Sequence, residues 1–282
     1  MWTRVPRDAI ASAAESDMPE NFERSAVDFW DLLRKHQIPF PNSESLVGPA
    51  TQMKSEEPIG VHGTTVIAVK FRDGVLDIAD RRATASNYIM YEEAEKILSL
   101  DDETLIAIAG SYAAASEAVR FLRHSFKYYA RSQMQDMSLE GKLSEVSRVL
   151  RQSVPGALQG IGGFLPIVSA YDHKKKEGRI FFYDMLGARF ESREFGSAGS
   201  GSERIRGSFE YIVRTKGPFR EMTLQESLRE SLLLLDIAAS LDTATGGLSK
   251  VLPAAKTVTA QGVVDIPVAE LEVIRKELMR ER

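Results

Sequence analysis

The sequence predicts an α+β protein in which antiparallel β-sheets are covered by helices. Three observations predict this fold class. Residues 62–109 alternate short apolar runs with tight turns, residues 111–154 carry two long stretches of helical periodicity, and residues 164–240 repeat the order of strands followed by helices. Runs of strands followed by runs of helices are typical of α+β layering and not of alternating βαβ units.

Composition limits the classes of function. The 282 residues are 43% hydrophobic, which is enough to bury one sizeable core. The net charge of -4, without a basic patch, argues against a nucleic-acid partner. The chain has no cysteine and four scattered histidines, so we expect no disulfide, no metal site and no cofactor. No apolar run approaches the ~20 residues of a membrane span, and no secretory signal is visible, so we expect a cytoplasmic protein without a membrane partner.

The first 63 residues differ from the rest of the chain. They are polar, contain six prolines, and hold one possible amphipathic helix over residues 21–36. This segment is too sparse in apolar residues for a core of its own. From composition alone it is a flexible appendage.

The first structured part is predicted to be a β-hairpin. Apolar runs over residues 66–71 and 75–79 flank Asp73-Gly74, a pair typical of tight turns. The second run ends in Asp80, and Lys96 follows 16 residues later. Taken alone, these charged residues could be solvated strand ends.

The residues around this hairpin also suit nucleophilic catalysis. A threonine hydroxyl is a weak nucleophile that needs a base, and a free α-amine on the same residue can serve because its ordinary pKa lies near 8. At Thr64 that amine exists only if the preceding peptide bond is cut. A lysine near the hydroxyl would favour its alkoxide-like form, and an aspartate would fix the lysine. Lys96 and Asp80 are suitable for these two roles.

Periodicity places the remaining elements. We expect strands at 96–100 and 104–109 and a helix from 111 to about 135. Gly110 stands at the strand-to-helix junction, where backbone N–H groups are free to point at a ligand oxygen. A second helix from 138 to about 154 should end at Pro155, and 156–163 should be a loop. The later elements are strands at 164–170, 179–184 and 188–195, a Gly-Ser turn at 196–202, helices at 203–215 and 224–240, a strand region at 256–264 and a helix at 267–282.

Three motifs resemble proteasome β subunits, especially the bacterial, actinobacterial-like type. They are the Gly63-Thr64-Thr65 start, the run from Asp80 to Thr84, and the run from Asp242 to Gly247. The resemblance extends over residues 62 to 265. It implies the four-layer αββα sandwich of amino-terminal-nucleophile hydrolases. It further implies that residues 1–63 are a propeptide, removed at the Gly63-Thr64 bond, and that residues 64–282 form the catalytic domain.

The resemblance also implies residue roles. Thr64 would be the nucleophile of a threonine endopeptidase, Asp80 and Lys96 would polarise it, and the N–H of Gly110 would stabilise the oxyanion. Asp242 and Thr245 would hold the terminal amine and the neighbouring Ser200. Thr84 would pair with an extended substrate through its backbone. A mostly apolar substrate pocket would be lined by Ala83, Ala94, Leu98, Ile108, Tyr112 and Ser116, with Tyr112 larger than is typical of its place.

The implied partners follow from the same resemblance. Other copies of the chain would form two stacked seven-membered rings between rings of α subunits, and an AAA+ ATPase ring would deliver unfolded or tagged proteins to an internal chamber. Two alternatives remain open from the sequence. One is a two-ring threonine peptidase without α subunits, although such proteins usually lack a long leading segment. The other is an inactive structural ring subunit, although such subunits typically lose the threonine or the lysine that this chain keeps.

Overall fold

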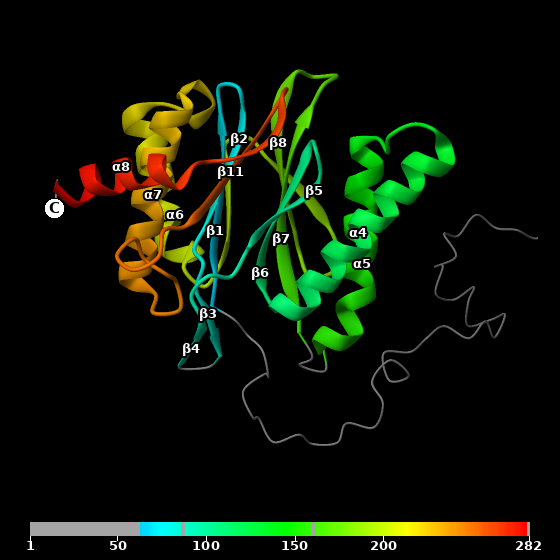
Figure 1. Ribbon diagram of the computed structural model, residues 1–282, viewed down its shortest axis with the longest axis horizontal. Helices are drawn as coiled ribbons and strands as arrows, with labels where there is room; N and C mark the ends of the chain where they lie inside the picture. Colours follow the sequence, from blue (N-terminus) through cyan, green and yellow to red (C-terminus); the bar gives the residue numbers. More distant parts are fainter. Residues whose placement is uncertain (1–62, 86–87, 159–161, 281–282) are drawn as a thin grey trace, which may run out of the picture. The chain divides into compact units, whose positions relative to one another are not determined.

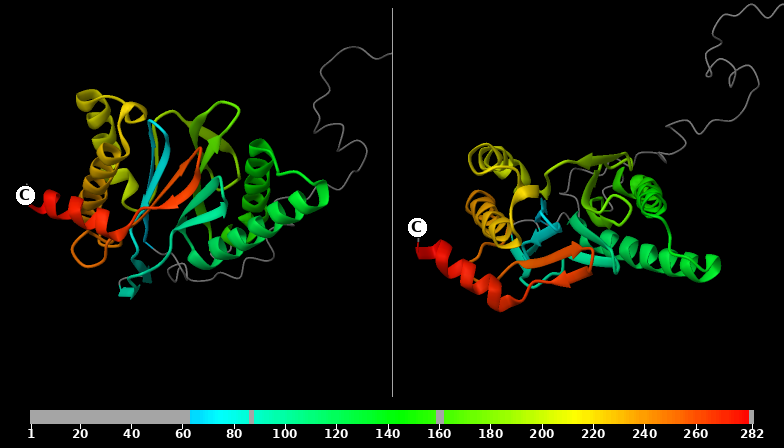
Figure 2. Two further views of the ribbon diagram at one scale, coloured as in Figure 1. Left: turned by 45° about the horizontal axis from the view of Figure 1, so that its top comes forward. Right: turned by 90° about the horizontal axis from the view of Figure 1, so that it is seen from above.

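The computed structural model describes residues 63–85, 88–158 and 162–280. The helix expected at 21–36 lies outside the described residues. Two five-stranded antiparallel sheets pack face to face, and helices cover both outer faces (Figure 1). The view from above separates the four layers (Figure 2). The predicted α+β class and αββα layering are therefore confirmed.

The first sheet has the strand order β10-β1-β2-β11-β12. Its strands are β1 (Thr65–Phe71), β2 (Gly74–Ala79), β10 (Phe195–Gly199), β11 (Ala254–Thr259) and β12 (Gly262–Asp265). The strand β1 lies between β2 and β10, with Val66 opposite Ala79 and Thr65 opposite Gly199. This register brings the start of β1 to the ends of both neighbouring strands.

The second sheet has the order β5-β6-β7-β8-β9. Its strands are β5 (Ile97–Asp101), β6 (Thr104–Gly110), β7 (Phe164–Asp172), β8 (Glu177–Tyr183) and β9 (Arg189–Ser192). A separate two-stranded hairpin, β3 (Ala83–Ala85) with β4 (Tyr88–Tyr91), follows β2. The hairpin was not predicted, because the four apolar residues of β4 are all exposed and show no alternation.

Helices α6 (Ser202–Lys216), α7 (Leu224–Leu241) and α8 (Val268–Arg280), with the 3₁₀ turn η1 (Phe219–Glu221), cover the first sheet. Helices α4 (Tyr112–Gln133) and α5 (Leu139–Leu158) cover the second sheet. The helix α7 begins with a capping box in which Thr223 and Glu226 satisfy each other's backbone N–H groups. None of the helices in the described ranges is both long and apolar enough to cross a membrane.

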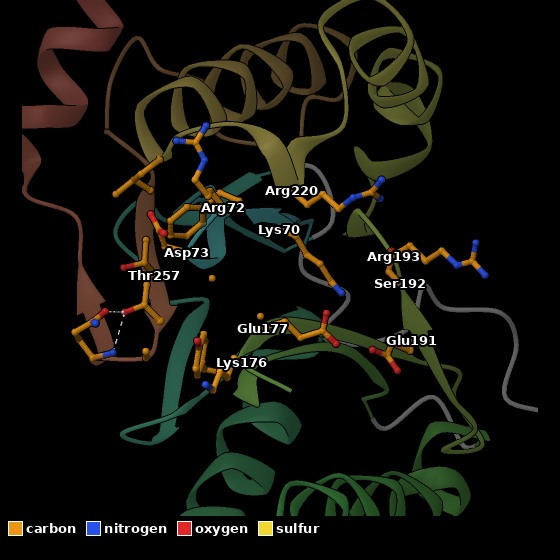
Figure 3. A pocket seen from close by; sticks show the side chains of 18 residues that line it. Lys70, Arg72, Asp73, Lys176, Glu177, Glu191, Ser192, Arg193, Arg220 and Thr257 are labelled. Atoms are coloured by element: carbon orange, nitrogen blue, oxygen red, sulfur yellow. Dashed lines mark hydrogen bonds between the residues drawn. The ribbon is translucent and has the colours of Figure 1, made fainter. Parts of the chain in front are cut away.

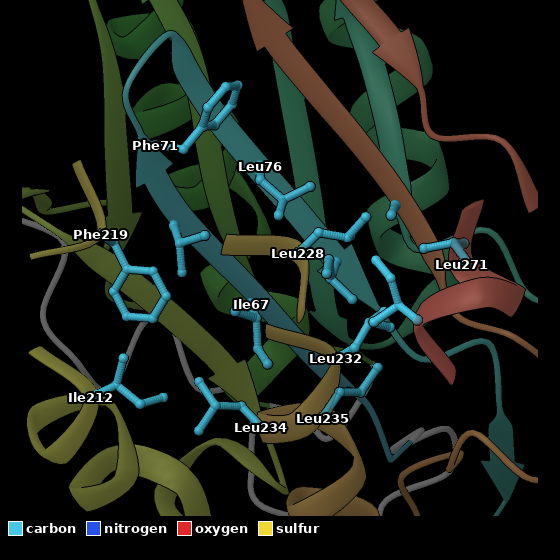
Figure 4. Packing of buried hydrophobic residues seen from close by; sticks show 14 of the residues in the cluster. Ile67, Phe71, Leu76, Ile212, Phe219, Leu228, Leu232, Leu234, Leu235 and Leu271 are labelled. Carbon is cyan, nitrogen blue, oxygen red and sulfur yellow. The ribbon is translucent and has the colours of Figure 1, made fainter. Parts of the chain in front are cut away.

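Alternation along the strands divides the core into three layers. In β1, Ile67 points toward the helices and packs with Leu76, Phe219 and Leu232 (Figure 4). Its neighbour Val66 points the other way, into the layer between the two sheets. The third layer lies between the second sheet and α4 and α5. Both strands of the hairpin β1–β2 are buried on both faces, so the start of β1 lies between two packed layers.

Two predicted boundaries were wrong. Pro155 lies inside α5, which continues to Leu158, because a proline removes only its own N–H from the hydrogen-bond ladder and one such loss is tolerated in a last turn. The single strand expected at 188–195 is two strands in different sheets, and β10 includes Gly196 to Gly199, which we had expected to be a turn. The glycines permit close approach: a Cβ on Gly199 would lie 1.8 Å from the Thr64 carbonyl oxygen.

Candidate active site

The junction between Gly63 and Thr64 is buried just before β1. Thr64 is 3% exposed, and its Oγ1 donates a hydrogen bond of 2.8 Å to the carbonyl oxygen of Gly63. The N–H of Gly63 donates to Thr84 Oγ1 at 3.0 Å. A Cβ on Gly63 would lie 2.0 Å from the Ala244 Cβ, so the packing demands a glycine. The hydroxyl of Thr64 thus already lies beside the carbonyl that precedes it.

Lys96 and Asp80 meet beneath this junction. Asp80 follows β2 and Lys96 precedes β5, so the two sheets contribute one residue each. Lys96 Nζ donates to Asp80 Oδ1 at 2.8 Å and to the carbonyl oxygens of Arg82 at 2.5 Å and Gly63 at 3.4 Å. Burial lowers the pKa of Lys96, and the charge of Asp80 opposes that effect. The amine therefore reaches the same carbonyl as the Thr64 hydroxyl.

The Asp80 carboxylate is fully satisfied. Besides Lys96, it accepts backbone N–H bonds from Thr65 at 2.8 Å, Arg82 at 3.0 Å and Gly246 at 2.9 Å. Four donors around one buried carboxylate fix its orientation. Asp80 consequently ties together the start of β1, the end of β2 and the loop after α7.

Asp242 forms a second acidic centre at the end of α7. Its Oδ2 accepts bonds of 2.5 Å from both Ser200 Oγ and Thr245 Oγ1. Burial alone would raise the pKa of Asp242, but these two hydroxyls, the N–H of Ala244 and the charge of Arg204 together lower it. The predicted trio of Ser200, Asp242 and Thr245 is thus brought together by side-chain hydrogen bonds.

The two acidic centres are joined. The guanidinium of Arg82 donates to the carbonyl oxygens of Thr243 at 3.0 Å and Thr245 at 3.3 Å. Thr65 Oγ1 lies 2.6 Å from Thr245 Oγ1. The loop that carries Asp242 is therefore fixed to the start of β1.

Gly110 ends β6 with a positive φ of 106°. A Cβ there would lie 2.6 Å from the carbonyl oxygen of Gly163, so glycine is required by the backbone. No hydrogen bond between described residues links Gly110 to Thr64. Its oxyanion role stays a prediction.

The predicted substrate-pocket residues fall into two groups. Leu98, Ile108 and Tyr112 belong to the apolar cluster beneath α4, and Ser116 lies half-buried on that helix. Tyr112 is half-buried at the start of α4 and packs its ring against this cluster. Three of the predicted pocket residues thus belong to one apolar cluster.

The second group lies close to the junction. Ala83 and Ala94 are buried, and the N–H of Ala94 bonds the carbonyl oxygen of Arg81 at 2.8 Å. Thr84 contacts Gly63 through its side chain, a contact that the sequence did not predict. Gly63 thus contacts the side chain of the residue whose backbone was expected to pair with a substrate.

A large cavity lies away from this site. It has a volume of about 1060 Å³ and is lined by the β1–β2, β7–β8 and β11–β12 turns, at the other end of β1 from Thr64 (Figure 3). The amine of Lys70 points into it, whereas the guanidinium groups of Arg193 and Arg220 point away. None of the predicted catalytic or pocket residues lines this cavity, so it is not the candidate active site.

The sequence analysis missed two residues. Thr65 was not assigned a role, although its place directly after the expected nucleophile was a signal. Asp77 is fully buried between the sheets, and its only sequence signal is that it interrupts the apolar run of β2. Within the described ranges, no group of three or more histidine, aspartate or glutamate side chains could hold a metal ion.

This fold and site define a class. An αββα sandwich with a buried threonine at the start of its first strand, facing a buried lysine, is the arrangement of an amino-terminal-nucleophile hydrolase. The family model "Proteasome subunit" matches residues 61–252. The chain belongs to the proteasome subunit family.

Individual relatives agree with this assignment. The chain is 33% identical over 224 residues to proteasome subunit beta 2 of Thermomonospora curvata, covering 78% of each chain. It is 31% identical over 261 residues to a proteasome subunit beta of Frankia casuarinae, covering 92% of this chain and 90% of the relative. With the corresponding subunit of Acidothermus cellulolyticus the identity is 32% over 252 residues, covering 87% and 84%.

Proposed function

We propose that this protein is a β subunit of a proteasome core particle, a threonine endopeptidase whose nucleophile is Thr64. One observation carries the proposal. The Thr64 hydroxyl and the Lys96 amine both contact the carbonyl oxygen of Gly63, at 2.8 and 3.4 Å, in a buried setting. A hydroxyl and a cation at one carbonyl are what nucleophilic attack on that carbonyl needs.

The first step proposed is self-cleavage of the Gly63-Thr64 bond. Thr64 Oγ1 attacks the Gly63 carbonyl carbon, the peptide C–N bond breaks, and the hydroxyl proton passes to the departing nitrogen. Gly63 is then held as an ester on Thr64, whose amine is free. Water hydrolyses the ester, and residues 1–63 leave as a propeptide with a new carboxylate.

Turnover would repeat this chemistry on a substrate peptide. The free amine of Thr64, through a water, takes the hydroxyl proton and later gives it to the leaving amine. Lys96, held by Asp80, stabilises the developing alkoxide, while Ser200, Asp242 and Thr245 hold the amine. An N–H donor such as that of Gly110 on the oxyanion would contribute on the order of 3 kcal/mol. Water then hydrolyses the acyl ester.

The proposal extends to assembly and substrate. We expect two seven-membered rings of this chain between α-subunit rings, with an AAA+ ATPase ring supplying unfolded proteins in the cytoplasm. A peptide would pair with the backbone at Thr84, as an added strand. The apolar character of Leu98, Ile108 and Tyr112 favours apolar side chains before the scissile bond, and the bulk of Tyr112 favours smaller ones.

The test combines mass and activity. The full chain is produced with an α partner, and the mass of the β chain in the assembled particle is measured beside its peptidase rate. We expect a chain that begins at Thr64. The variants Thr64→Ala and Lys96→Ala should assemble uncleaved and inactive, whereas Lys70→Ala, a lysine in the distant cavity, should behave as wild type. Normal peptidase activity in Thr64→Ala would refute the proposal.

A further inference from the structure

Thr65 makes a hydrogen bond whose direction can be assigned. Its side chain is fully buried, and its Oγ1 lies 2.6 Å from Thr245 Oγ1. Thr245 in turn lies 2.5 Å from Asp242 Oδ2. An ionised carboxylate only accepts, so the single hydroxyl proton of Thr245 is committed to Asp242. The hydroxyl proton of Thr65 must therefore be donated to Thr245.

The residues around this bond pack closely against both hydroxyl groups. A Cβ on Gly201 would lie 2.3 Å from Thr65 Oγ1 and 2.9 Å from Thr245 Oγ1. The turn before α6 thus closes over the two hydroxyls, and a glycine is needed for it to do so. A threonine that is stiff at χ1 and packed on this side keeps its hydroxyl in one direction.

The backbone of Thr65 holds the other acidic centre. Its N–H donates to Asp80 Oδ1 at 2.8 Å, and its carbonyl oxygen accepts from the Asp80 N–H at 3.2 Å. Thr65 thus bonds Asp80 through its main chain. Through its side chain it reaches Asp242 by way of the Thr245 hydroxyl, and no other described residue is shown to make both connections. It also adjoins Thr64 directly.

We infer that Thr65 is a positioning residue, whose hydroxyl orients Thr245 and thereby fixes Asp242 and Ser200 against the Thr64 amine. The inference rests on the proposed function. Thr65 is 0% exposed, so it cannot contact a substrate, and its role acts on the chemical step alone. Without its hydroxyl, Thr245 can turn away from Asp242, and the Thr64 amine loses its fixed neighbours.

The test compares Thr65→Val, which removes the hydroxyl at nearly constant shape, with Thr65→Ser, which keeps it. Thr257→Val is the matched control, because Thr257 is a buried threonine of the same sheet, on β11 and away from the junction. Assembled particles are assayed with a short fluorogenic peptide, per processed chain. We expect Thr65→Val to lower kcat about 10- to 100-fold with KM within about twofold. Thr65→Ser and Thr257→Val should stay within about threefold of wild type.

Two further readouts separate positioning from packing. In Thr65→Val the acid limb of the pH profile of kcat should move to higher pH, because Asp242 loses an oriented donor and its pKa rises. In a Thr245→Val background, Thr65→Val should cost little more, since the two hydroxyls act in series. Additive losses in the double variant would overturn the inference.

The remaining outcomes also support or refute the positioning role of Thr65. Wild-type kcat in Thr65→Val, or an equal loss in Thr65→Ser, would refute a role for the hydroxyl. If Thr65→Val fails to cleave itself, the rate of Gly63-Thr64 scission becomes the readout: normal scission in Thr65→Ser and Thr257→Val supports the inference, and failure in either refutes it. The proposed function is tested separately, because it falls only if Thr64→Ala remains active.

Discussion

Two buried aspartates lie three residues apart along the chain at β2 and behave in opposite ways. Asp80, just after the strand, receives four hydrogen-bond donors including Lys96. Asp77, in the middle of the strand, receives one bond of 2.7 Å from Ser169 Oγ, and its Oδ2 has no partner among the described residues. Lys256 lies opposite Asp77 in the register of β11, but it pairs with Asp265 at 2.7 Å.

The number of hydrogen-bond donors decides how burial affects a carboxyl group. Burial raises the pKa of Asp77 to about 7, and the smaller, opposing effect of the Ser169 bond does not cancel it. A buried carboxylate without enough donors takes up a proton, whereas one with several donors can remain charged and hold a cation. The same residue type therefore serves as a fixed hydrogen-bond acceptor just after the strand and as an acid with a raised pKa within the strand.

The largest effect should come from Asp80→Asn. The substitution leaves the Lys96 amine buried without its anion, which should cost roughly 3–5 kcal/mol of stability and lower peptidase activity by about 100-fold or more. Asp77→Asn should keep activity within about threefold. Thermal unfolding and peptide hydrolysis are measured on both variants. Equal losses of activity would show that Asp80 and Asp77 do not differ in their importance for the site.

The next effect is the pH dependence of stability. The unfolded pKa of Asp77 is near 3.8 and the folded value about 7, so between these values the folded chain binds more protons. The free energy of unfolding contributed by this group is therefore greatest below pH 4 and is lost as the pH rises to 7, by roughly 4 kcal/mol in total. Denaturant unfolding at several pH values should show this fall.

In Asp77→Asn the fall should flatten, and the variant should be more stable than wild type at pH 8. A slope unchanged by the substitution would assign the pH dependence to other groups.

A smaller effect is expected from Ser169→Ala. Removing the one hydrogen bond that a described residue donates to the Asp77 carboxyl group should destabilise the fold by about 1–3 kcal/mol at pH 8, where the carboxylate most needs a donor, and by less at pH 5. Unfolding measurements at the two pH values give the difference. A cost that is larger at pH 5 would show that the bond serves the neutral acid.

The smallest effect concerns Arg82, which lies two residues after Asp80 and holds the loop after α7 through hydrogen bonds. Arg82→Ala removes two bonds to loop carbonyls from a partly exposed guanidinium, and we expect kcat to fall about three- to tenfold. Arg81→Ala is the matched control, because the Arg81 guanidinium bonds Glu93 and Glu95 near the surface and reaches no carbonyl of the described loop after α7. Equal effects of the two variants on kcat would show that the bonds from Arg82 to the loop do not matter for activity.

The sequence could predict the β1–β2 hairpin, the helices and the meeting of Asp80 with Lys96, because strand periodicity and short motifs are local signals. It could not predict β10 in a glycine-rich run, where the low strand propensity of glycine is overridden by pairing with β1. The bond between Thr65 and Thr245 joins residues 180 positions apart, and the single donor at Asp77 depends on packing between sheets. Both are set by tertiary structure, which no local pattern encodes.

The contact between Gly63 and Ala244 carries a further consequence. The loop that bears Asp242 and Thr245 lies against Gly63, the residue before the proposed cleavage site, and leaves no room there for even a methyl group. On the proposed cleavage at Gly63-Thr64, a leader sequence grafted onto this chain must therefore end in glycine to fit at the junction, whatever the rest of its sequence. The loop proposed to hold the catalytic amine would thus select the last residue of its own leader before the site acts on any other chain.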